Sequence, residues 1–172
     1  MPSFRTRRRV RHSAADMFDL VADVEKYPLF LPLCTGLRVR KRAQDGQGRD
    51  VLTADMSVGY KAIRETFTSK VTLDRQNLQI LVEYIDGPFS KLENRWTFID
   101  LPQATGAPEG RGACEVDFFI DYEFRSRMLG LLMGTMFDTA FRRFAEAFER
   151  RADIVYGRRG LAGPTGATDT AG

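Results

Sequence analysis

The middle of the chain, residues 35–124, alternates between apolar and polar side chains. This alternation is typical of β-strands that pack one face on a core and turn the other to water. Glycine-containing clusters interrupt it at residues 45–48, 58–59, 86–88 and 103–112, where we expect turns. The pattern therefore predicts an antiparallel meander with one covered face.

Three stretches of this meander show the covered face most clearly. Its predicted members are Leu52, Ala54, Met56 and Val58, then Leu92, Asn94, Trp96 and Phe98, and finally Val116, Phe118, Ile120, Tyr122 and Phe124. Aromatic and branched residues dominate this face, as expected of side chains that pack beneath another layer.

Two segments outside the meander have helical periodicity. Residues 13–31 begin with Ser13 at an N-cap position, and apolar residues follow at near-helical spacing. Residues 128–150 carry phenylalanine at i, i+4, i+7 and i+11, namely Phe137, Phe141, Phe144 and Phe148. A long helix with such a stripe can cover the meander, so we expect an α+β fold in which the sheet grips the helix.

The run from Tyr27 to Leu33, with sequence YPLFLPL, is too apolar for an ordinary surface loop. Pro28 and Pro32 hold it out of a long helix, so it must pack against an apolar surface. We interpret it as a gate over a cavity, and the alternative is a plug at the open end of the sheet.

Composition limits the function classes. The chain has 172 residues, 43% of them hydrophobic, which suits one domain with its own core. A net charge of +3 is well below that of a dedicated nucleic-acid binder, and we expect no DNA binding. The longest apolar stretch, residues 128–137, is too short to span a bilayer, and no secretory signal follows Met1. We expect a cytoplasmic protein with a domain at 1–156 and a disordered Gly/Ala/Thr-rich tail at 157–172.

Few residues suit catalysis. His12 is the only histidine and is predicted at a strand end, where we expect a surface or edge position. Cys34 and Cys114 lack zinc-site spacing, and we expect them to be reduced, buried thiols. We therefore predict no catalytic or metal site. A cyclase that only orients a reactive polyketide needs few catalytic groups and remains an alternative.

Three blocks of sequence carry a family resemblance. They are residues 24–34 (VEKYPLFLPLC), residues 86–89 (DGPF) followed by Lys91-Leu92 and Trp96-Thr97-Phe98, and residues 147–152 (AFERRA) followed by Val155-Tyr156-Gly157. With the order strand, two short helices, meander and long C-terminal helix, the chain resembles the START-like, helix-grip superfamily. Within it, the blocks resemble the ubiquinone-binding (coenzyme Q-binding) START proteins, a family that includes ribosome-association toxins and is grouped with polyketide cyclases. The resemblance covers residues 1 to 157.

This resemblance implies a protein that binds ubiquinone, or a related isoprenoid lipid, between the long helix and a curved sheet. Such a protein needs no cofactor, does no chemistry on the ligand, and supports respiration by making quinone available. A factor that binds the large ribosomal subunit and a polyketide cyclase or aromatase remain the alternatives.

The ligand would contact the gate and the apolar faces beneath the helix. We expect contacts from Tyr27, Pro28, Phe30, Leu31, Pro32, Met56, Ile63, Glu65, Phe67, Asn94, Trp96, Phe118, Phe137 and Phe141. Periodicity alone favours the alternative that these side chains fill a solid core, and the resemblance favours a hollow one.

Two polar residues fall on these apolar faces. Glu65 alternates with Ile63 and Phe67, and a carboxylate among apolar neighbours is costly unless it is paired. We expect it to contact a quinone carbonyl or hydroxyl, unless it pairs with Arg64 or Arg95 or a β-bulge turns it outward. Asn94 carries the same alternatives and could donate to a carbonyl oxygen.

Basic residues crowd the first predicted strand. Arg5, Arg7, Arg9 and Arg11 suit anionic lipid headgroups or ribosomal RNA phosphates, and the alternative is a solvated strand edge. We expect Arg38, Arg40, Lys41 and Arg42 on a neighbouring strand. The membrane is favoured because a quinone is collected there, which predicts a peripheral position at the inner face of the cytoplasmic membrane.

The start of the long helix is more apolar than one buried face requires. Its residues are Met128, Leu129, Leu131, Leu132 and Met133. We expect part of this cluster to touch a membrane surface or to line the entrance of the cavity.

Overall fold

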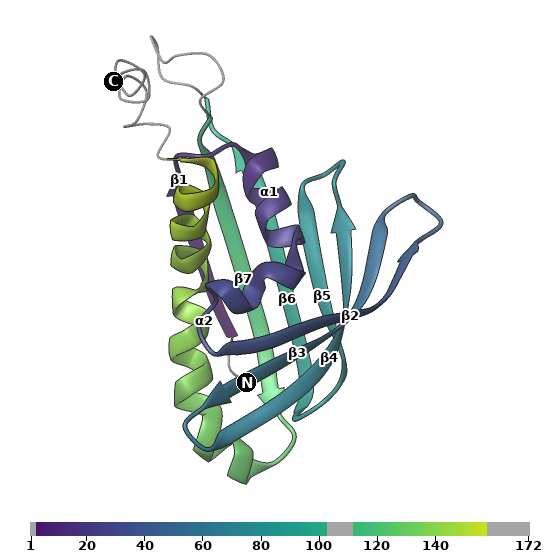
Figure 1. Cartoon of the computed structure of the whole chain (residues 1–172), viewed down its shortest axis with the longest axis vertical. Helices are drawn as coiled ribbons and strands as arrows, with labels where there is room; N and C mark the ends of the chain where they lie inside the picture. Colours follow the sequence, from purple (N-terminus) through teal and green to yellow (C-terminus); the bar gives the residue numbers. More distant parts are fainter. Residues whose placement is uncertain (1–2, 103–111, 158–172) are drawn as a thin grey trace, which may run out of the picture.

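The computed structural model describes residues 3–102 and 112–157, in which a seven-stranded sheet curves around one long helix (Figure 1). In chain order the elements are β1 (Ser3–Val10), α1 (Ala14–Ala22), the 3-10 helix η1 (Val24–Leu29), β2 (Cys34–Gln44), β3 (Asp50–Tyr60), β4 (Ile63–Asp74), β5 (Gln79–Asp86), β6 (Phe89–Asp100), β7 (Cys114–Phe124) and α2 (Arg127–Tyr156). All but one residue of the predicted turn at 103–112, and of the predicted tail at 157–172, lie outside the described residues.

The sheet is antiparallel throughout, with strand order β1-β7-β6-β5-β4-β3-β2. Strands β2 to β7 form the meander, and its last strand, β7, pairs with the first strand of the chain, β1 (Figure 1). The predicted α+β helix-grip fold, with two short helices after the first strand, is confirmed.

The same strand order corrects one prediction about charge. Because β1 and β2 are the two edge strands, they lie at opposite edges of the sheet. The basic residues of β2, from Arg38 to Arg42, therefore do not neighbour the arginines of β1. Sequence alternation defines the faces of a strand, but it does not fix the order of strands in a sheet.

One predicted turn is also misplaced. β3 continues through Gly59 to Tyr60, and the chain turns at residues 61–62, where Lys61 has φ 54°. Gly59 instead allows the segment from Leu33 to Thr35 to lie close to β3. Its N–H donates to Leu33 O at 3.0 Å, and a Cβ at this position would meet Thr35 Cγ2 at 3.1 Å. A glycine inside a strand pattern can mark such a contact as well as a turn.

Both helices begin at serine caps. Ser13 Oγ accepts from Asp16 N at 3.1 Å, as predicted, and Ser126 Oγ accepts from Leu129 N at 3.0 Å. α2 is longer than the predicted 128–150 and ends only at Gly157, where φ is 80°.

The extra turns of α2 explain why the expected surface position of His12 is wrong. The imidazole is fully buried, and its Nε2 lies 2.8 Å from Asp153 Oδ1. Asp153 belongs to the part of α2 beyond the predicted helix end. The sequence pattern therefore predicted no element that would bury the residues after β1.

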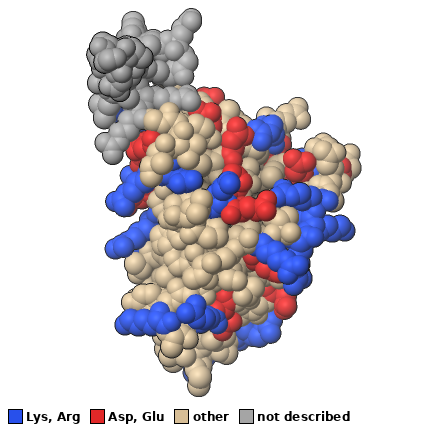
Figure 2. Space-filling model, viewed as in Figure 1, with Lys and Arg blue, Asp and Glu red and all other residues tan. Residues whose placement is uncertain are grey.

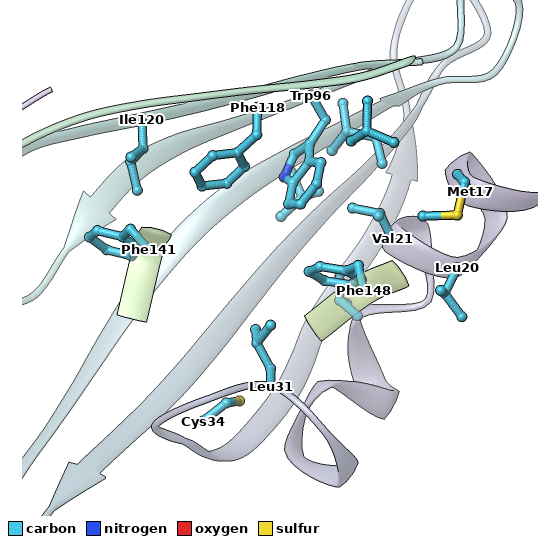
Figure 3. Close-up of a cluster of buried hydrophobic side chains, with 14 of the residues drawn as sticks. Met17, Leu20, Val21, Leu31, Cys34, Trp96, Phe118, Ile120, Phe141 and Phe148 are labelled. Atoms are coloured by element: carbon cyan, nitrogen blue, oxygen red, sulfur yellow. The ribbon is translucent and has the colours of Figure 1, made fainter. Parts of the chain in front are cut away.

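The core lies between α2 and the concave face of the sheet. Figure 3 shows Trp96, Phe118 and Ile120 reaching from the strands toward Phe141 and Phe148 of α2. The predicted phenylalanine stripe of α2 does face the sheet, with Phe137, Phe141 and Phe148 buried and Phe144 partly so.

Candidate functional site

A cavity of 80 Å³ lies beneath α2, between the helix and the concave sheet. Its walls come from α2, from strands β2 to β7, and from the segment around η1 that precedes β2. Nine residues predicted to bind ligand line it: Tyr27, Leu31, Pro32, Met56, Phe67, Asn94, Trp96, Phe137 and Phe141. The structure thus brings together residues that are more than a hundred positions apart in sequence, while ligand contact by each remains a prediction.

Five of the predicted residues lie elsewhere. Phe118 is fully buried behind the cavity wall, with its ring 4.7 Å from that of Trp96. Phe30 packs its ring 5.1 Å from that of Phe148 and borders a separate groove on the outer side of α2. Pro28 is exposed, and Ile63 lines a surface groove beside the cavity.

Glu65 is the fifth. It lies on the same face of β4 as Phe67 but nearer the strand end, is half-buried, and does not line the cavity. β4 pairs with β3 without a register shift, and its one irregularity, against β5, lies at Thr68/Ser69, so no β-bulge falls at Glu65. Neither arginine considered as its partner pairs with it in the described part of the chain, and Arg95 pairs with Glu93 instead. The contact of Glu65 with a quinone stays a prediction.

Asn94 holds the aromatic wall of the cavity in place. Its Nδ2 donates to Phe119 O at 2.9 Å, and its Oδ1 accepts from Trp96 Nε1 at 2.8 Å. The amide oxygen is therefore occupied, while an amide carries two N–H donors and only one is used by these contacts. The second N–H could donate to a carbonyl oxygen of a ligand.

Ser69 is the polar residue that the sequence analysis missed. It lines the cavity from β4 and is 5% exposed, and its Oγ has no hydrogen-bond partner among the described residues. A buried hydroxyl without a partner is costly. The sequence signal was available, because Ser69 continues the alternation that places Phe67 and Val71 on the covered face.

Twelve further residues, all but two of them small or aliphatic, line the cavity without having been predicted to contact a ligand. They are Val24, Leu33, Leu37, Ala54, Val58, Val71, Val82, Leu92, Ile120, Ala140, Phe144 and Phe148. Ala54 and Ala140 matter most, because a larger side chain at either position would occupy the space.

Tyr27 contributes its ring rather than its hydroxyl. The hydroxyl donates to Val21 O at 2.5 Å, which ties η1 to the end of α1. Burial raises the pKa of Tyr27 well above its ordinary value, with smaller contributions from Cys34 and Asp23. The phenol therefore stays neutral, and its ring packs 5.2 Å from that of Phe148.

The segment predicted as a gate forms one end of the cavity. Leu31 and Pro32 line the cavity directly (Figure 3 labels Leu31), and Pro32 also borders two grooves on the surface. Leu33 follows with φ 66°, a left-handed conformation that is unfavourable for leucine. The wall between cavity and surface is thus a short segment that belongs to neither a regular helix nor a strand.

The thiols are poor nucleophiles in this environment. Cys34 and Cys114 are free and buried, and burial raises their pKa to about 11 and about 12. Both therefore remain protonated near neutral pH. In the part of the chain that the structure describes, no group of three or more His, Cys, Asp or Glu side chains could hold a metal ion.

The arginines of β1 are largely paired. Arg5 donates to both carboxylate oxygens of Asp117, at 3.0 and 2.9 Å, and Arg7 lies 3.5 Å from the same carboxylate. The hydrogen bond from Arg5 holds the pKa of Asp117 below its usual value. Arg9 and Arg11 are exposed and have no ion pair among the residues described. Contact of this edge with a membrane or RNA remains a prediction.

None of the described helices has the length and apolar character needed to cross a membrane. The most apolar part of α2 is its start, where several large side chains are exposed.

Comparison with known sequences identifies related proteins. A family model described as "Polyketide cyclase / dehydrase and lipid transport" matches residues 10–149. Ribosome association toxin RatA of Escherichia coli (strain K12) is 36% identical over 159 residues, which cover 92% of each chain. Coenzyme Q-binding protein COQ10 homolog B, mitochondrial, of Xenopus laevis is 30% identical over 148 residues, covering 86% of this chain and 56% of that protein.

Comparison with solved structures supports the fold. A START superfamily protein from Mycobacterium smegmatis superimposes with a TM-score of 0.68 at 21% identity, covering 89% of this chain and 98% of that one. At this identity the likeness shows the architecture alone, a curved sheet that holds a C-terminal helix.

Proposed function

Because the chain belongs to the polyketide cyclase / dehydrase and lipid transport family, we propose that it binds ubiquinone (coenzyme Q), or another isoprenoid lipid, beneath α2. One observation carries the proposal: the apolar cavity contains a buried hydroxyl, Ser69 Oγ, without a protein partner among the described residues. Apolar walls suit an isoprenoid tail, and a hydroxyl suits a quinone carbonyl. The coenzyme Q-binding relative supports this class of ligand.

The energetics of the tail favour such binding. Each buried methylene contributes about 0.8 kcal/mol, and micromolar affinity corresponds to about 8 kcal/mol. A few isoprenoid units therefore supply enough apolar area before the entropy cost of association is subtracted. The hydrogen bond from Ser69 would add about 1 kcal/mol of affinity and would also fix where the headgroup lies.

The cavity has to enlarge to take this ligand, because 80 Å³ is well below the roughly 300–1,000 Å³ of typical small-molecule pockets. The segment Leu31–Leu33 is the wall best suited to move. The left-handed conformation of Leu33 costs about 1–2 kcal/mol, which an outward rearrangement of the segment would release. The closed form is then the resting state of a gate.

The proposed role is that of a carrier, which makes quinone available to respiration without changing it. The protonated thiols of Cys34 and Cys114 offer no nucleophile, and His12 is held by Asp153 outside the cavity. Proton transfer and nucleophilic attack would both need a group within reach of the ligand.

Extraction of the purified protein tests the proposal. Protein isolated from its own host should release stoichiometric quinone into organic solvent, as identified by mass spectrometry. Ser69→Ala should lower the retained amount, whereas Ser57→Ala should not, because the Ser57 hydroxyl lies outside the cavity and contacts Thr66 Oγ1 at 3.1 Å. Protein that arrives empty, and stays empty when offered quinone in detergent, would contradict the proposal.

A second candidate function is association with the large ribosomal subunit, which the similarity to RatA favours. Arg9 and Arg11, the unpaired cations of the β1 edge, would then contact RNA phosphates. The double variant Arg9→Glu/Arg11→Glu should abolish cosedimentation with ribosomal particles, and raised salt should do the same. Wild-type protein that fails to cosediment at low salt would remove this candidate.

A further inference from the structure

The first turns of α2 present large apolar side chains to solvent. Met128, Leu131 and Leu132 are 70%, 79% and 61% exposed. Their spacing of i, i+3 and i+4 places them on one face of the helix, so they form a single patch. In Figure 2 the lower end of the molecule, where α2 begins in Figure 1, is largely tan, and both blue and red side chains lie next to it. We call these three residues the apolar tip.

Among the described residues, two cations that form no ion pair lie beside the apolar tip. Arg127 begins α2 and Lys61 lines the groove that also contains Leu132, and neither has an ion pair in the described part of the chain. Arg143 lines the same groove, but eleven residues separate it from Leu132, which is about 16 Å along the helix. The lining of that groove includes no Asp or Glu. The charge of this groove is therefore positive, whereas a second groove, which Leu131 and Arg127 line, also includes Glu123 and Asp138.

The groove connects the apolar tip with the cavity. Its lining includes Leu132 of the apolar tip and also Pro32, Leu33 and Ala140. The last three residues also line the cavity itself. The gate thus separates the interior of the protein from a groove that begins at exposed apolar side chains.

We propose that the apolar tip, together with Lys61 and Arg127, docks on a bilayer that contains anionic phospholipid. Leucine and methionine side chains that project from one helix face would enter the boundary between headgroups and acyl chains, and the cations would contact the headgroup phosphates. The groove then gives a lipid a route from the bilayer to the gate. This last step, unlike the docking itself, rests on the proposed function.

A lipid surface fits these observations better than a protein partner. Stable protein interfaces bury about 800 Å² per partner, over surfaces that match in shape. Three flexible side chains on one helix face, each more than half exposed, give a projecting point instead of a broad surface. A projecting apolar point with unpaired cations beside it is typical of peripheral membrane contact.

Flotation with vesicles tests the docking. Wild-type protein should float with vesicles of phosphatidylcholine and phosphatidylglycerol and much less with phosphatidylcholine alone. The double variant Leu131→Asp/Leu132→Asp should bind about tenfold or more weakly. Ile154→Asp is the matched control, because Ile154 is 74% exposed at the other end of α2 and its replacement should leave flotation unchanged.

Charge variants separate the two basic regions. Lys61→Glu and Arg127→Glu should each weaken binding to anionic vesicles about fivefold, whereas Arg9→Glu on β1 should not. Equal flotation of the wild type and the Leu131→Asp/Leu132→Asp variant would overturn the proposal. So would a wild-type dimer, measured by light scattering, that this variant dissociates, because the apolar tip would then be a contact between two copies.

The docking and the proposed function fail in different ways. The Leu131→Asp/Leu132→Asp variant leaves the cavity lining intact and should still take up a short-chain quinone from solution. Wild-type protein that floats with anionic vesicles but binds no quinone would contradict the proposed function alone. Protein that binds quinone but never floats would contradict the docking alone.

Discussion

The two sides of the space beneath α2 are built from different residues. On the β6 and β7 side, aromatic rings pack edge to face, with Trp96 4.7 Å from Phe118 and 5.0 Å from Phe148 between ring centroids. On the β3 to β5 side, the wall consists mostly of small and aliphatic residues such as Ala54 and Ser69, and Phe67 contributes its one aromatic ring. The aromatic side is closely packed, and the cavity opens between Trp96 on that side and the small residues opposite.

This difference separates stability from ligand capacity. Close aromatic packing holds α2 on the sheet, because each ring buries a large area and adds a specific contact energy. Small side chains opposite a helix leave volume that could hold a ligand, at the cost of lost dispersion contacts. Substitutions on the two sides should therefore have different consequences, and the following predictions run from the largest effect to the smallest.

Removal of a ring should cost most on the filled side. Phe118→Ala should lower the free energy of unfolding by about 3–5 kcal/mol, because Phe118 is fully buried among other rings. Phe141→Ala should cost about 2 kcal/mol, since Phe141 already borders the cavity and loses fewer contacts. Urea denaturation of both variants measures the difference, and equal losses would show that the cavity is effectively filled.

Added volume should show the same ranking, with the larger loss of stability at the filled position. Ala152→Leu should destabilise by about 1–3 kcal/mol, because Ala152 is fully buried where α2 meets its neighbours. Ala140→Leu, on the same helix, places its extra atoms in the cavity and should change stability by less than about 1 kcal/mol. Thermal unfolding compares the two, and a larger loss for Ala140→Leu would mean that the cavity cannot accept even three carbon atoms.

Removal of the unpaired hydroxyl should stabilise the protein slightly. Ser69→Ala eliminates a buried polar group without a described partner and should raise the free energy of unfolding by about 1 kcal/mol. Ser57→Ala, at a hydroxyl that lies outside the cavity, should leave it nearly unchanged. A clear destabilisation by Ser69→Ala, again measured in urea, would show that the hydroxyl is already satisfied.

The smallest predicted effect is a pH dependence of stability, which arises from an ion pair on the outer face of the sheet. Because the pKa of Asp117 is lowered in the folded protein by Arg5, this carboxylate stabilises the fold above its unfolded pKa of about 3.9. The contribution disappears as pH falls through the lower folded pKa. Asp117→Asn should thus be less stable than wild type at neutral pH and equal to it in strong acid, as followed by circular dichroism. A difference that persists in strong acid would assign the effect to packing.

The fold was largely predictable because it follows from two periodicities. Alternation between residues 35 and 124 defines the covered sheet face, and the spacing from Phe137 to Phe148 defines the helix that covers it. The order of the strands and the length of α2 could not be predicted in the same way. The position of the basic strand β2 in the sheet and the burial of His12 both depend on contacts between distant segments, which no local sequence pattern contains.

The site was predictable in kind but not in detail. Glu65 and Ser69 lie on the same face of β4, yet only Ser69 reaches the cavity. Periodicity assigns a side chain to a face, whereas its depth along the strand depends on where α2 crosses the sheet. Residue size gave the missing information, because Ser69, Ala54 and Ala140 leave the volume that the larger predicted residues enclose.

Quenching of tryptophan fluorescence tests the central claim most directly. Trp96 is the only tryptophan and lines the cavity, so a bound quinone would quench its emission at close range. Titration with a short-chain ubiquinone analogue should give saturable, stoichiometric quenching in wild-type protein, and Ala140→Leu, which fills the cavity, should abolish the saturation. Quenching that rises linearly without saturation, and equally in both proteins, would contradict a quinone site beneath α2.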